Sequence, residues 1–133
     1  MEKSMKPLKL ILTGVFAAIL VSGCAGTAPV KNVSQNVAGS HSNAQVRQAI
    51  LAAGLNRGWI MNPVSDGVID GKILLRGHSA DIRINYNSNS YQIKYIASSN
   101  MDAKDGNIHP NYNRWVANLD KDIQLELARQ NIK

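Results

Sequence analysis

The clearest helical pattern in the chain covers residues 43–57. Its apolar side chains recur at spacings of three and four residues, as on one side of a helix: Val46, Ala49, Ile50 and Ala53. Ser42 and Gln45 match a capping box, in which the serine oxygen accepts from the backbone and the glutamine reaches back. A helix is therefore predicted over 43–57, and Gly58 suits the left-handed conformation that ends many helices.

The middle of the chain changes to a period of two, the pattern of strands with one buried face. Residues 79–86 and 91–95 each alternate apolar and polar side chains, and an Asn/Ser-rich turn separates them. Shorter apolar runs at 59–61 and 69–75 precede them, and Pro63 confines the first of these to a sheet edge. The pattern predicts an antiparallel meander with one apolar face and one solvated face.

A second helix is predicted from Pro110 almost to the end of the chain, because proline suits the first helical turn. Its apolar stripe comprises Tyr112, Trp115, Val116, Leu119, Ile123 and Leu127. A tight turn is expected at 76–79, with Gly77 at its first central position. The order α-β-β-β-β-α predicts an α+β fold in two layers, with three to four antiparallel strands and the N-terminal and C-terminal helices on one face.

The start of the chain has the pattern of a signal peptide. Three lysines precede an uncharged run at 10–21, which is shorter than the roughly 20 apolar residues that span a bilayer. The run leads into Val21-Ser22-Gly23-Cys24, a motif at which signal peptidase II cuts before a lipid-modified cysteine. Residues 1–23 are predicted to be a lipoprotein signal peptide and Cys24 the lipidation site. The alternatives are a single membrane-spanning helix and a secretory signal followed by a chance cysteine.

The residues after the cysteine divide into two predicted parts. Residues 24–41 are rich in small and polar side chains without an apolar period, which is typical of a flexible tether, and 42–133 form the α+β domain. Ala25 stands where Asp favours retention in the inner membrane. We therefore expect the protein in the bacterial cell envelope, held by its lipid at the outer membrane and facing the periplasm.

The charge of the chain indicates which classes of binding partner to expect. Beyond residue 23 the chain carries 12 Lys and Arg against eight Asp and Glu, and the basic residues are scattered. A scattered, mildly basic surface gives no support for nucleic-acid binding, although it suits anionic lipid or polymer. Cys24 is the only cysteine, so no intramolecular disulfide can form.

The sequence lacks the usual signatures of catalysis. Its three histidines, His41, His78 and His109, have no further ligand at metal-binding spacing, so no metal or cofactor is expected. It contains neither a G-x-S-x-G nucleophile motif nor a glycine-rich phosphate loop. We expect a protein that binds and is not an enzyme. A hydrolase assembled only by the fold is the weaker alternative.

One dense cluster of recognition side chains covers residues 108–115. Together with the 76–79 turn it supplies the candidate binding residues Arg76, His78, His109, Asn111, Tyr112 and Arg114. The structural alternative is that Pro110 starts the helix after an Asn or His cap, that Tyr112 and Trp115 are buried, and that Arg114 faces solvent.

The chain also resembles a family of small, uncharacterised bacterial lipoproteins. The resemblance rests on Arg57-Gly58-Trp59, on residues 75–80, on Tyr91 and Tyr95, and on residues 108–115. It implies an envelope lipoprotein with a compact α+β domain and transfers no catalytic residue.

The leading hypothesis for function is an interaction module that presents its loops or its outer sheet face to another envelope protein. The alternative is a binder of anionic envelope polymer or lipid that uses Arg76, His78, His109 and Arg114.

Replacing Cys24 with serine tests the anchor directly. Cys24→Ser should abolish lipidation and leave an unprocessed or mislocalised precursor, because no other residue of the chain can form the thioether. Metabolic labelling with a fatty acid measures this. Label that persists on the variant would refute the assignment.

Overall fold

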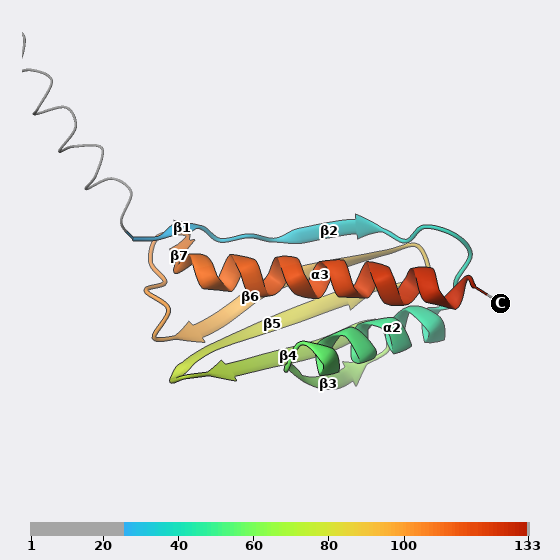
Figure 1. The fold of residues 1–133 in the computed structure, drawn as a ribbon, viewed down its shortest axis with the longest axis horizontal. Coiled ribbons are helices and arrows are strands. Elements are labelled where there is room, and N and C mark those ends of the chain that lie inside the picture. The colour runs from blue at the N-terminus through green and yellow to red at the C-terminus, as the bar shows by residue number, and fades with distance from the viewer. Residues whose placement is uncertain (1–25, 133) are drawn as a thin grey trace, which may run out of the picture.

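The computed structural model describes residues 26–132, so the predicted signal peptide and Cys24 lie outside the described residues (Figure 1). In chain order the elements are β1 (Ala28–Pro29), β2 (Val33–Asn36), α2 (Asn43–Asn56), β3 (Ile60–Ser65), β4 (Val68–Leu75), β5 (His78–Tyr86), β6 (Ser90–Ser99), β7 (Asn107–Ile108) and α3 (Pro110–Gln130).

The main sheet is antiparallel and has the strand order β2-β6-β5-β4-β3, while β1 and β7 form a separate pair. The meander β3 to β6 is the one predicted from the alternating pattern, and Pro63 lies in the edge strand β3. The α+β class with an antiparallel sheet and two helices is confirmed. The strand number is corrected to five, because β2 joins the sheet from a segment predicted to be a tether.

One face of the sheet supplies the core. Val33, Ile93, Ile84 and Ile69 are paired in register and form a single apolar row across four strands. All four are buried, and so are Ile50 of α2 and the α3 residues Leu119 and Ile123. Both helices lie over this face, and no described element covers the opposite face (Figure 1).

The helices begin and end close to where the sequence predicts. Ser42 and Gln45 form the complete capping box, and Gly58 has a φ of 81° just after α2. Arg57, the C-cap residue of α2, donates to both carboxylate oxygens of Asp122 on α3, at 2.7 and 3.2 Å. The guanidinium holds the pKa of Asp122 below its usual range. This ion pair fixes the end of α2 against α3.

The segment from residue 28 to residue 41 is part of the domain, which corrects the predicted flexible tether over 24–41 and the domain start at 42. β1 pairs with β7, β2 pairs with β6, and Val33 is buried opposite Ile93. Val30 and Val37 are partly buried against the same core. Single valines among polar residues give too weak a pattern to predict a strand, and the order of this segment comes from its partners. We call residues 28–41 the N-terminal segment.

Side-chain hydrogen bonds fasten the N-terminal segment along α3. Asn113 accepts from the Lys31 amide at 2.9 Å and donates to the Pro29 carbonyl at 2.8 Å. Further along, the ring of His41 lies with Nε2 3.0 Å from the Leu127 carbonyl. The segment therefore follows the helix from its first turn to its last turns (Figure 1).

Asp120, midway along α3, joins the N-terminal segment to the sheet. Its carboxylate accepts from the Tyr91 hydroxyl at 2.6 Å and from the Gln35 amide at 3.0 Å. Burial, and after it the nearby carboxylate, raise the pKa of the Tyr91 phenol, so the phenol stays a proton donor. One carboxylate thus links β2, β6 and α3.

The turn between β4 and β5 differs in detail from the prediction. β4 continues to Leu75, so Arg76 and Gly77 are the two central residues, with φ values of 53° and 80°. Arg76, and not Gly77, holds the first central position. Positive φ at both positions matches the twist of a tight two-residue hairpin.

A pair of neighbouring substitutions tests the N-terminal segment. Val33→Ala should lower the free energy of unfolding by about 1–2 kcal/mol, at about 0.8 kcal/mol for each buried carbon lost plus the cavity left behind. Ser34→Ala, on the exposed side of the same strand, should change it by less than about 0.5 kcal/mol. Urea melts measure both. If neither substitution changed the free energy of unfolding, the segment would be a free tether.

Candidate functional site

Two of the predicted site residues meet at one end of the domain. His78 is the first residue of β5 and His109 directly precedes α3. Their ring centroids lie 6.4 Å apart with a 41° tilt. The fold therefore brings together two histidines that are 31 positions apart in the sequence.

The His78 ring connects the β4–β5 turn to the loop after β6. Its Nδ1 lies 2.6 Å from the backbone carbonyl oxygen of Asn100. The side-chain amide of Asn100 donates to the Gly77 carbonyl at 3.3 Å. Because a carbonyl can only accept, Nδ1 carries the hydrogen in this bond. In the neutral ring Nε2 is then a free acceptor.

His109 is the N-cap of α3. Its Nδ1 accepts a hydrogen bond from the backbone N–H of Asn111 at 3.0 Å. The backbone N–H of His109 donates to the Met101 carbonyl at 2.8 Å. The predicted alternatives for the cap, Asn or His, are thereby resolved in favour of His109. The capping bond leaves Nδ1 without a proton, so the neutral ring has its hydrogen on Nε2.

Asn111 and Arg114 form a contact on the first turn of α3. The Arg114 guanidinium donates to the Asn111 side-chain oxygen and is exposed to solvent. Arg76 is also exposed, at the hairpin turn two residues before His78. This end of the domain thus presents two guanidinium groups and two partly buried imidazoles.

Tyr112 is not available to a partner, which corrects its place among the candidate binding residues. Its side chain is fully buried and makes an edge-to-face contact with Tyr95, with centroids 5.4 Å apart and planes at 88°. Burial raises the pKa of the Tyr112 phenol. Trp115 packs against the same core and Arg114 faces solvent, as the structural alternative for residues 108–115 predicts.

The outer sheet face holds a hollow that was not predicted from the sequence. It measures about 490 Å³, and Ile60 on β3 and Ile96 on β6 line it. Ile96 lies at a β-bulge, where the register with β5 shifts between Asp81 and Ile82. The available signal was the adjacent apolar pair Tyr95-Ile96, which breaks the alternation of the strand.

Two ion pairs lie between these isoleucines. Lys72 Nζ is 2.7 Å from Asp81. Arg83 donates to both oxygens of Asp70, at 2.7 and 3.0 Å, and holds the pKa of that carboxyl below its usual range. The hollow therefore has apolar side chains at its two sides. At its centre are two ion pairs whose charges cancel.

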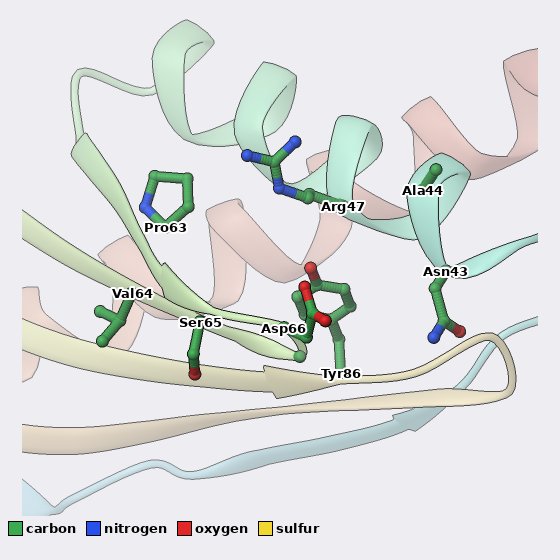
Figure 2. A pocket seen from close by; sticks show the side chains of 9 residues that line it. Asn43, Ala44, Arg47, Pro63, Val64, Ser65, Asp66 and Tyr86 are labelled. Atoms are coloured by element: carbon green, nitrogen blue, oxygen red, sulfur yellow. The ribbon is translucent and has the colours of Figure 1, made fainter.

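A second pocket, of about 480 Å³, lies between the start of α2 and the β3–β4 turn. Figure 2 shows Arg47 on the helix side and Ser65 and Asp66 on the turn side, with Tyr86 between them. Arg47, Ser65 and Asp66 are all exposed, so water screens the charges of this pocket.

The described part of the chain contains neither a group of metal ligands nor a membrane-spanning helix. Within residues 26–132, no three His, Cys, Asp or Glu side chains are grouped so that they could hold a metal ion. Neither α2 nor α3 has the length and apolarity that a membrane span requires. Comparisons with protein-family models, with curated proteins and with solved structures give no match.

The capping role of His109 can be separated from a binding role by two substitutions. His109→Ala should lower the free energy of unfolding by about 1 kcal/mol, whereas His109→Asn should restore most of it, because asparagine also caps helices. Arg114→Ala, on the exposed side of the same turn, serves as the control and should be nearly neutral. Urea melts measure the free energy of unfolding of each variant. Equal decreases for His109→Ala and His109→Asn would contradict the capping role.

Proposed function

We propose that this protein is a lipid-anchored binding module of the bacterial cell envelope that acts without catalysis. The lipid on Cys24 would hold it at the outer membrane, facing the periplasm. The motif Val21-Ser22-Gly23-Cys24 supports the anchor, and the absence of Asp at position 25 supports the location. The leading partner is another envelope protein, bound on the outer sheet face.

The observation that carries this proposal is the exposed apolar set on the uncovered face of the sheet. Ile60 and Ile96 are 66% and 54% exposed. Single exposed apolar residues are common on protein surfaces and need no explanation. Here, however, Ile60 and Ile96 line one hollow, and none of the elements within residues 26–132 covers that face of the sheet. Grouped apolar exposure of this kind is typical of interaction sites.

The chemistry of the hollow defines the surface that would fit it. An apolar side chain from the partner would fill the space between Ile60 and Ile96. Polar groups around that side chain would meet the Lys72–Asp81 and Asp70–Arg83 pairs. An apolar centre with a polar rim is the usual composition of a protein interface. The carboxylates are already paired with cations, which supports binding over acid–base catalysis at this site.

A second candidate function is binding of an anionic envelope polymer or lipid at the His78–His109 end. The short distance between the two rings, with Arg114 and Arg76 exposed nearby, favours it. Binding of this kind would weaken steeply with ionic strength, whereas an apolar contact at the hollow would not.

Crosslinking of the intact lipoprotein in cells tests the leading candidate. Ile96→Lys should reduce the crosslinked partner species at least fivefold, because a charge would enter the apolar side of the hollow. Leu125→Lys, which places the same charge on an α3 residue that is 46% exposed, should leave the species unchanged. If both variants retained the species in full, the outer sheet face would not be the binding site.

A further inference from the structure

The chain enters the domain very close to the proposed lipid. Cys24 precedes Ala28 by four residues, and β1 is held by β7 through the pairs Ala28–Ile108 and Pro29–Asn107. Val30 adds a backbone hydrogen bond to Gly106 at 2.9 Å. Four residues span at most about 14 Å when fully extended. The start of β1 must therefore stay within this distance of a lipid on Cys24.

The hairpin turn of β4 and β5 belongs to the same end of the domain. The hydrogen bonds of His78 and Gly77 with Asn100 join this turn to the loop that leads into β7. Figure 1 shows the turn, β7 and the start of α3 at one end of the long axis, and the C-terminus at the other. We call this the anchor-proximal end. The turn between β5 and β6 lies at the opposite end, about 30 Å away at about 3.3 Å per strand residue.

The tip of this hairpin has side chains that suit a lipid interface. Leu74 and Leu75 are 68% and 47% exposed, and Arg76 follows them in the turn. Adjacent leucines can enter the boundary between headgroups and acyl chains. The arginine guanidinium has the geometry to bind phosphate oxygens. Neither leucine is among the residues that pack against the core.

The charge of the anchor-proximal end fits an anionic membrane surface. Its formally charged residues are Lys31, Arg76, Lys104 and Arg114, with Asp102 and Asp105. Four cations against two carboxylates give a positive balance, which anionic headgroups attract.

We infer that the anchor-proximal end rests on the membrane, with Leu74, Leu75 and Arg76 in contact with an anionic lipid surface. This inference rests on the proposed lipidation of Cys24. In this orientation the strands of the main sheet run away from the bilayer. The hollow at Ile60 and Ile96 then opens sideways along the membrane, where a neighbouring envelope protein can reach it.

Fluorescence quenching in vesicles tests the orientation. The lipidated protein is reconstituted into phosphatidylcholine vesicles that contain phosphatidylglycerol and a lipid with a nitroxide on its headgroup. Ser99→Cys and Asn89→Cys place single thiols near the two ends of β6, since the lipid blocks Cys24 and no other cysteine is present. A thiol-reactive fluorophore at 99 should be quenched at least threefold more than one at 89. Equal quenching, or stronger quenching at 89, would overturn the orientation.

A second measurement tests the hairpin contact itself. In the Ser99→Cys protein, the combined changes Leu74→Ser, Leu75→Ser and Arg76→Gln should reduce quenching at least twofold. The matched control combines Leu55→Ser and Arg47→Gln, two exposed residues of α2, and should leave quenching unchanged. Unchanged quenching in the hairpin variant would refute the contact.

The mass of the purified protein separates these outcomes from the anchor. A protein without lipid on Cys24 would refute the proposed function. A lipidated protein without a quenching difference would refute only the orientation.

Discussion

The structure depends on the pairing of β2 with β6, which completes the core and fixes the N-terminal segment. Val33 extends the apolar row that Ile93, Ile84 and Ile69 form across the sheet. Without β2, the long strand β6 would be an open edge, and unpaired edges promote association with other chains. The Asp120 carboxylate reinforces the pairing, because it binds Gln35 from β2 and Tyr91 from β6 at once. Hydrogen bonds to a charged acceptor are the stronger kind, so this link stabilises three elements together.

Most of the recognition side chains at residues 108–115 have a structural role in this fold. Tyr112 is buried in the core, and His109 caps α3. Asn113 forms hydrogen bonds with the backbone of Pro29 and Lys31. Side chains that are common at binding hot spots are thus used here to hold the N-terminal segment. Within residues 108–115 only Arg114 is exposed. This leaves the outer sheet face and the anchor-proximal end as the two surfaces that we propose for binding.

The parts of the fold that the sequence predicts correctly are those with a local cause. The capping box at Ser42 and the strict alternation over 79–86 each arise within a few residues, so the pattern is visible without a partner. β2 has only one buried residue, and its register comes from residues 90–93, more than 50 positions away. The bulge at Ile96 likewise follows from pairing with β5. The histidine pair and the hollow join distant strands and loops, so only the fold reveals them.

The short distance between the proposed lipid on Cys24 and β1 determines what the hairpin tip would contribute. A lipid-modified cysteine with two or more acyl chains anchors a protein stably without further contacts, so the tip adds little to residence on the membrane. Its contribution is orientation. A short linker gives a tethered group an effective concentration in the millimolar range, so even a contact of millimolar affinity is well populated. Leu74, Leu75 and Arg76 would therefore need to supply only a weak contact. A fixed orientation in turn limits the directions from which a partner can approach the hollow, and this favours recognition between neighbours on the same membrane.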